Sequence, residues 1–343
     1  MLKLDNHSSG RHFLHIPGPS PAPARVLRAI SFQTIDHRGP EFGQFGLKVL
    51  DGIKKIFKTE QPVIVYSASG TGSWEGALVN VLNPGDKVLF YETGQFANLW
   101  RALGKRLGLD VEVVTKPGQD TWRWGVDASV IEERLRKDTG HEIKAVCVVH
   151  NETSTGVTSN IAAVRKAIDS LKHPALLLVD TVSGLGSADY EHDKWGADVT
   201  VSGSQKGLML PPGLGFNAVS QKAIDASKKA TMPRAYWDWA DIIEFNKQGF
   251  WPSTPNTNLL YGLHEALDQM QSRFNAIGEA IFETYVLMPH VIESSVSAVN
   301  QSNSTMRAWR HQQEQQQQLL PLQLQQQLLL LQLQQQRPPL QQQ

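Results

Sequence analysis

Three features of this 343-residue sequence have side chains or backbone suited to binding and activating a small ligand. A glycine-rich turn, Ser69 to Ser73 (SGTGS), follows the apolar run VIVYSA. Its glycines let the backbone approach a ligand, and the free N–H groups at a helix start favour an anion such as phosphate. Asp180 ends the apolar run ALLLVD, and Lys206 lies in the later segment SGSQKG. A carboxylate can hold a cation, and an amine can react with a carbonyl group.

Each feature is a weak signal when it is taken alone. Glycine-rich turns are often only tight turns, a lone lysine is usually a solvated surface residue, and an aspartate after a strand often caps a helix. Together they supply what pyridoxal phosphate needs: an anion cradle, a carboxylate that keeps the pyridine nitrogen protonated, and an amine for a Schiff base. We therefore predict that this chain binds pyridoxal phosphate.

A dinucleotide site is the competing interpretation. Gly70, Gly72 and Gly76 resemble a loosened Rossmann fingerprint, and Glu92 ends the next predicted strand, where a ribose-binding acid would lie. An NAD-dependent oxidoreductase has no use, however, for an acid and a lysine at the ends of two later strands. The turn is not a Walker A loop, because no Gly-Lys-Ser/Thr follows it.

The elements that must position these residues alternate along the chain. Apolar runs predict strands, polar-apolar periodicity predicts helices, and their alternation implies βαβ crossovers. We expect an α/β fold with a mostly parallel sheet, helices on both faces, and ligands at the carboxyl ends of the strands. The predicted strands are residues 63–69, 87–92, 110–115, 143–150, 175–180 and 197–204, and the predicted helices are residues 24–30, 41–58, 74–82, 97–107, 130–137 and 161–171.

Composition excludes several classes of protein. The chain has 33 basic and 33 acidic residues, so it lacks the positive charge of a dedicated nucleic-acid binder. Its one cysteine, Cys147, rules out an intramolecular disulfide and a cysteine-based zinc cluster. No run of eighteen apolar residues predicts a membrane span, and the first residues lack the apolar core of a secretory signal. We expect an intracellular protein that binds neither nucleic acid nor metal, in a compartment that the sequence leaves open.

Four segments are expected along the chain. Residues 1–24 form an amino-terminal arm, which is too poor in apolar side chains to build a core and is expected to lie across something else, such as another subunit. Residues 25–270 form the cofactor-binding domain. Residues 271–311 read as a degenerate or truncated region, and residues 312–343 as a low-complexity tail with 17 Gln and 10 Leu.

Five segments in a fixed order resemble one family. HIPGPS, SGTGSWEGALVNVLNPGD, HNETSTGV, LLLVDTVSGLG and SGSQKGLMLPPGLG are similar to segments of class V, fold-type I aminotransferases, and most similar to the serine–glyoxylate and alanine–glyoxylate members. The resemblance covers roughly Arg11 to Gln269. It implies the large domain of fold-type I, with pyridoxal phosphate as cofactor.

The resemblance also implies roles for individual residues. Lys206 would form the Schiff base with the cofactor and carry the proton between substrate and cofactor. Asp180 would pair with the pyridinium nitrogen, and Phe96 would stack on the ring. The remaining residues implied to bind the cofactor are Thr153 near the phenolic oxygen, Ser69, Gly70, Thr71 and Gln205 around the phosphate, and Thr254 reaching that phosphate from the second subunit of a homodimer.

The implied reaction is a ping-pong transamination. A small amino acid such as serine or alanine leaves as its 2-oxo acid, and glyoxylate then takes the amino group and becomes glycine. Cysteine desulfurases of the same family would need a mobile catalytic cysteine and a histidine just before the lysine. Here Gln205 precedes the lysine, and Cys147 lies inside an apolar strand.

Beyond Gln269 the resemblance fades. Family members continue into a smaller domain, whose arginine binds the substrate α-carboxylate. Arg273, Arg307 and Arg310 are the arginines between Gln269 and the Gln-rich tail, and none has a matching context. We therefore expect a truncated or absent small domain, from a shortened, frame-shifted or mis-spliced chain. The alternative function that follows is a catalytically impaired protein that binds pyridoxal phosphate.

Overall fold

The computed structural model describes the backbone of residues 14–282 and the side chains of residues 14–272. The described side chains belong to one compact unit, Met1–Ser272. Predictions that fall on residues 283–343, including those on Arg307, Arg310 and the Gln-rich tail, lie outside the described residues, as does the side chain of Arg273.

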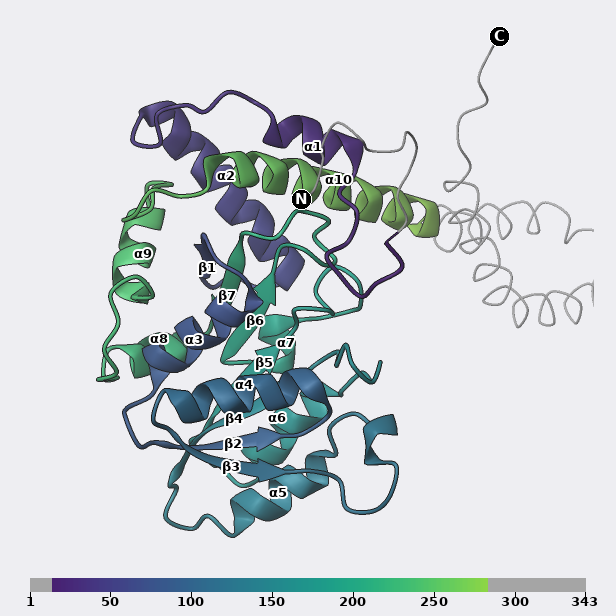
Figure 1. The fold of residues 1–343 in the computed structure, drawn as a ribbon, viewed down its shortest axis with the longest axis vertical. Helices are drawn as coiled ribbons and strands as arrows, with labels where there is room; N and C mark the ends of the chain where they lie inside the picture. The colour runs from purple at the N-terminus through teal and green to yellow at the C-terminus, as the bar shows by residue number, and fades with distance from the viewer. Residues whose placement is uncertain (1–13, 283–343) are drawn as a thin grey trace, which may run out of the picture. The chain divides into compact units, whose positions relative to one another are not determined.

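A seven-stranded sheet forms the centre of this unit (Figure 1). Its order is β1-β7-β6-β5-β4-β2-β3, and the five strands from β6 to β3 pair in parallel. Only β7 runs the other way, pairing antiparallel with β1 and β6. The prediction of a mostly parallel sheet is therefore confirmed. The strands are β1 Val63–Tyr66, β2 Lys87–Tyr91, β3 Asp110–Val114, β4 Ile143–Val149, β5 Leu176–Asp180, β6 Val199–Gly203 and β7 Gly215–Val219.

Helices cover the sheet, and the central strands are buried along their whole length. Every residue of β5 and β6 is buried, which requires cover on both faces. The helices are α1 Ala24–Ile30, α2 Pro40–Phe57, α3 Gly70–Val81, α4 Gln95–Arg106, α5 Ala128–Arg136, α6 Ile161–Ser170, α7 His192–Trp195, α8 Gln221–Ser227, α9 Trp239–Asn246 and α10 Thr257–Phe282, with a short 3₁₀ turn at Thr121–Arg123.

The first and last described helices lie side by side (Figure 1). Arg25 of α1 forms an ion pair with Glu265 of α10 at 2.6 Å, and Ile30 packs against Gly262. The backbone of α10 crosses the predicted domain boundary at residue 270, and that boundary stays a prediction. Among the described helices, α10 included, none is long and apolar enough to cross a bilayer.

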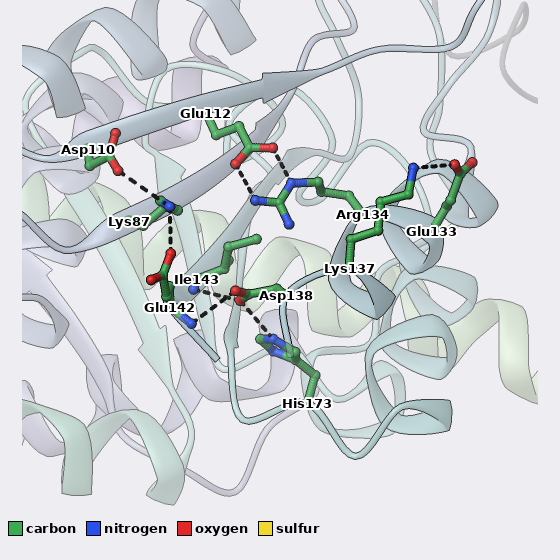
Figure 2. A network of polar contacts seen from close by, with 10 residues as sticks. All are labelled: Lys87, Asp110, Glu112, Glu133, Arg134, Lys137, Asp138, Glu142, Ile143 and His173. Atoms are coloured by element: carbon green, nitrogen blue, oxygen red, sulfur yellow. Dashed lines mark hydrogen bonds and ion pairs between the residues drawn. The ribbon is translucent and has the colours of Figure 1, made fainter. Parts of the chain in front are cut away.

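A polar network joins the amino ends of β2, β3 and β4 (Figure 2). At its centre the Asp138 carboxylate, which is 6% exposed, accepts hydrogen bonds from the N–H groups of Glu142 at 3.1 Å and Ile143 at 2.8 Å. His173 Nε2 lies 3.2 Å from the same carboxylate. Around it Lys87 bridges Glu142 and Asp110, and Arg134 binds Glu112. This network fixes the turn before β4, at the end of the strands opposite to the predicted ligand site.

Candidate active site

A cavity of about 290 Å³ opens at the carboxyl ends of β4 and β5. The helix starts after β1 and β2 and the loop after β6 complete its walls. Eight of the nine predicted site residues line it: Ser69, Gly70, Thr71, Phe96, Thr153, Asp180, Gln205 and Lys206. Thr254 is exposed and does not line the cavity, so within one chain the fold does not bring it to the other eight.

Asp180 reaches the cavity from the end of β5, as its position in the sequence predicts. Its side chain is 3% exposed and accepts hydrogen bonds from Trp74 Nε1 at 2.8 Å and from the Val182 N–H at 2.7 Å. Burial raises the pKa of this carboxyl to about 7, against the lowering effect of the two donors. Because both donors are neutral, a cationic group that entered the cavity would stabilise the ionised carboxylate.

Lys206 faces the same cavity from the loop after β6. Desolvation lowers the pKa of its amine, and the Asp180 charge acts in the opposite direction. A lowered pKa leaves a larger fraction of neutral amine at physiological pH, which is the form that attacks a carbonyl carbon and accepts a proton.

The amino-terminal arm covers this lysine. Lys206 Nζ donates to the carbonyl oxygen of Pro17 at 2.9 Å, and Ser20 Oγ donates to the carbonyl oxygen of Lys206 at 2.8 Å. The Ser20 N–H donates to the carbonyl oxygen of Gln205, also at 2.8 Å. Residues 17–20 of the arm thus lie across the lysine loop of their own chain, and contact of the arm with another subunit stays a prediction.

Gly18 is the residue that permits this close approach. Its φ is +147°, and an added Cβ would lie 2.5 Å from Lys206 Cδ and 2.9 Å from Nζ. Any side chain at this position would therefore have to displace the lysine or the arm.

The predicted anion cradle is the first turn of a helix rather than a loop. α3 begins at Gly70, four residues before the predicted start at Trp74, because Ser69 Oγ caps it by accepting from the Gly72 N–H. Gly70 packs closely on the loop after β5, since an added Cβ would meet Val182 at 2.7 Å. Gln205 Oε1 is buried without a protein partner among the described residues. Helix N–H groups and a polar amide with an unpaired atom suit a bound oxyanion.

Phe96 and Thr153 form the wall contributed by α4 and by the loop after β4. Phe96 is the second residue of α4, and its N–H donates to Glu152 Oε1 at 3.3 Å. Thr153 Oγ1 lies 2.5 Å from Ser183 Oγ. The two residues are brought together by packing, because they are far apart in the sequence.

Three of the residues that line the cavity with polar side chains were missed by reasoning from the sequence. Trp74 donates a hydrogen bond directly to Asp180. Its place in the site could have been suspected, because a buried indole N–H needs an acceptor. Ser183 and Asn151 have no such signal, because their placement depends on how the loops after β4 and β5 meet.

The fold also decides between the competing interpretations. In a Rossmann site the first two strands lie side by side, but here four strands separate β1 from β2. Glu92, the residue proposed for the ribose in that interpretation, is exposed and accepts a hydrogen bond from Asn98 Nδ2 at 3.0 Å.

Cys147 is buried inside β4, where desolvation raises the pKa of its thiol well above the ordinary value, so the thiol is not activated as a nucleophile. The described residues contain no cluster of His, Cys, Asp or Glu suited to a metal ion.

Known proteins are similar to this chain over most of the described residues. The family Aminotransferase class-V matches residues 12–309, which extends past Gln269, where the resemblance by motifs ends. The serine–glyoxylate aminotransferase of Methylorubrum extorquens is 48% identical over 79% of this chain and 70% of its own length. The enzyme of the same name from Hyphomicrobium methylovorum is 50% identical over 74% of this chain and 63% of its own length.

Two further proteins extend the comparison. The L-aspartate–glyoxylate aminotransferase of Paracoccus denitrificans is 42% identical over 83% of this chain and 76% of its own length. A solved alanine–glyoxylate aminotransferase from Nostoc sp. superposes with a TM-score of 0.70 and 30% identity, over 78% of this chain and 70% of that one. The match spans between 63 and 76% of the length of the three relatives compared by sequence.

The desolvated lysine and buried aspartate facing one cavity suit pyridoxal phosphate, as do the helix N–H groups and the Gln205 amide for its phosphate. With this geometry and the family match over residues 12–309, the chain belongs to the class V aminotransferases, fold-type I enzymes whose cofactor is pyridoxal phosphate.

Proposed function

We propose that this chain transfers the amino group of a small amino acid, serine or alanine in the first place, to glyoxylate, which gives glycine and a 2-oxo acid. The observation that supports this most is that Lys206 and Asp180 line one cavity, in a chain whose relatives are named for glyoxylate. Serine, L-aspartate and alanine are the donors named for different relatives, so the acceptor is better supported than the donor.

The chain's own residues divide the work of this reaction. Pyridoxal phosphate supplies, when bound, a carbonyl carbon for the amine and an aromatic ring that accepts electron density. Lys206 provides the amine that holds the cofactor and then moves a proton at the substrate Cα, a task for which its lowered pKa suits it. With the cofactor bound, Asp180 would hold the proton on the ring nitrogen, the Phe96 side chain would pack on the ring, and the N–H groups at the start of α3 would bind the phosphate.

We infer that the active form is a homodimer with a shared site. Thr254 is exposed and away from the cavity of its own chain, which fits a residue that serves the cofactor phosphate of a second copy. Phe32, Tyr236 and Phe245 are large apolar side chains that are 69%, 45% and 42% exposed. Such side chains are favoured at an interface. Sedimentation equilibrium should give twice the chain mass, and a monomer at micromolar concentration would contradict the inference.

The predicted segments remain part of this proposal: an arm to residue 24, a cofactor domain to residue 270, a shortened region to residue 311, and a Gln-rich tail. The alternative is a catalytically impaired protein that binds pyridoxal phosphate, and cofactor binding without turnover would favour it.

Absorption spectroscopy tests the proposed reaction. The purified chain with pyridoxal phosphate should show a visible band that serine or alanine bleaches and glyoxylate restores. Lys206→Ala should abolish the band and lower turnover by at least about 10³-fold, because both the covalent link and the proton transfer are lost. The matched control is Lys222→Ala, whose amine also has a pKa lowered by desolvation but lies at the other end of the sheet, against Ala175.

The outcomes separate the hypotheses. A band that amino acids leave unchanged would favour the non-catalytic alternative. Cofactor binding that survives Lys206→Ala with no change in the spectrum would contradict the assigned role of the lysine.

A further inference from the structure

Glu152 is a buried carboxylate that touches the site but has no part in the reaction described above. It is 1% exposed, and it lies in the loop after β4, directly before Thr153. Its four hydrogen-bond donors are all neutral. Oε1 accepts from the Ser154 N–H at 3.0 Å, Ser154 Oγ at 2.7 Å and the Phe96 N–H at 3.3 Å, and Oε2 accepts from the Ala97 N–H at 3.2 Å.

This carboxylate replaces the cap that α4 lacks. The residue before α4 is Gly94, which has no side chain to accept from the first N–H groups of the helix. Glu152 accepts two of them from a different loop, and its charge is favoured at the positive end of the helix. The fit is close, because a Cβ on Gly94 would lie 2.7 Å from Glu152 Cγ and 2.5 Å from Ser154 Oγ.

The same carboxylate connects two walls of the cavity. Phe96 is held through its own N–H, so the position of its ring follows from the position of the first turn of α4. Thr153 is the next residue after Glu152, so the loop that carries its hydroxyl is anchored at the same point. The Gln95 N–H also donates to Ser154 Oγ at 2.9 Å, and Ser154 Oγ donates to Glu152, so Glu152 is the buried acceptor at the centre of the contacts that tie the two walls together.

We propose that Glu152 is a positioning residue of the cofactor site, which caps α4 and thereby fixes the Phe96 ring against the Thr153 loop. The charge of Glu152 also contributes to the raised pKa of Asp180. The proposal rests on the assignment of pyridoxal phosphate and is independent of which amino acid is the donor.

A double-mutant cycle on cofactor affinity tests the proposal. The full chain is freed of cofactor, and the dissociation constant of added pyridoxal phosphate is measured by quenching of tryptophan fluorescence. Glu152→Gln should weaken binding about tenfold, because the amide NH₂ would face the Ala97 N–H. In a Phe96→Ala background the same change should weaken binding less than about threefold, because the ring through which Glu152 acts is gone.

A general loss of structure would give a different pattern. Equal weakening by Glu152→Gln in both backgrounds would overturn the proposal, as would no weakening in either. Glu92→Gln is the matched control, since Glu92 also accepts a hydrogen bond from α4, through Asn98, but is exposed and outside the cavity. It should leave the affinity unchanged.

Two further measures separate an effect on folding from an effect on cofactor affinity. Unfolding curves identify a temperature at which every variant is folded, and the affinities are compared there. If Glu152→Gln does not fold, Glu152→Asp replaces it in the cycle, because the shorter side chain keeps the charge but withdraws from α4. Failure of the proposed transamination would leave these binding measurements unaffected, so the two failures can be told apart.

Discussion

Two buried aspartates lie at opposite ends of the same sheet and differ in the way their charge is balanced. Burial alone would raise the pKa of Asp138, but the N–H groups of Ile143 and Glu142 and the ring of His173 hold it below its ordinary value (Figure 2). Asp180 is no more exposed, yet burial raises its pKa to about 7 because two neutral donors do not offset the desolvation. A buried acid whose neighbours satisfy its charge stabilises the fold, whereas one left unbalanced is suited to a cationic ligand.

The largest expected difference between Asp180 and Asp138 appears when each is replaced by asparagine. Asp180→Asn should lower kcat/KM for transamination by about 10³-fold, near 4 kcal/mol, because it removes the charge that we propose to face the cofactor nitrogen. Asp138→Asn should instead lower the free energy of unfolding by about 2 kcal/mol, because its amide leaves a buried donor poorly paired. Enzyme assays and urea unfolding measure the two effects. An activity loss at Asp138 with none at Asp180 would refute the division of roles.

A smaller effect concerns pH. A carboxyl whose pKa rises from 3.8 to about 7 on folding binds its proton more tightly in the folded cofactor-free chain, so its stabilising contribution is present at low pH. That contribution is lost as the pH rises to about 7, by roughly 2 kcal/mol between pH 5 and pH 7. Asp138, with a lowered pKa, contributes in the opposite sense and loses its contribution only in acid.

Urea unfolding of the cofactor-free protein at pH 5, 6 and 7 checks this pH effect. The buried histidines His150 and His192, whose pKa values are lowered to about 4, act in the opposite direction over part of this range. The quantity to compare is therefore the difference between the wild-type chain and Asp180→Asn. A difference that does not vary with pH would show that Asp180 is already ionised in the folded chain.

The smallest of the three effects is expected at Gly18, where the amino-terminal arm contacts Lys206. Gly18→Ala should slow formation of the lysine–cofactor link about tenfold, or about 1.4 kcal/mol, because the new Cβ meets Lys206 at 2.5 Å. Gly118→Ala is the control, since Gly118 also has a positive φ, +115°, but a Cβ there would have no neighbour within 4 Å. Borohydride trapping over time gives both rates. Equal slowing would mean that backbone strain, and not the contact with the lysine, is responsible.

The strands that are continuous apolar runs could be predicted from the sequence, because such a run must be buried and its length fits a strand in the middle of a sheet. It missed β7, whose sequence GFNAV contains the buried Asn217 and becomes a strand by pairing with β1 and β6. The placement of Asp180 and Lys206 could be predicted because Asp180 ends one predicted strand and Lys206 follows another. Glu152 as a cap of α4 and Gly18 on Lys206 could not, because each contact joins segments whose meeting depends on tertiary packing.

The antiparallel strand β7 also affects the order in which parts of the sheet can form during translation. Val63 pairs with Ala218, so β1 has no partner in the sheet until the ribosome has released the chain as far as β7. The first turn of α3 directly follows β1, so its position depends in part on that pairing. The helix start that we propose for the phosphate is therefore anchored through β1 only after more than 200 residues have been translated, later than Lys206 itself.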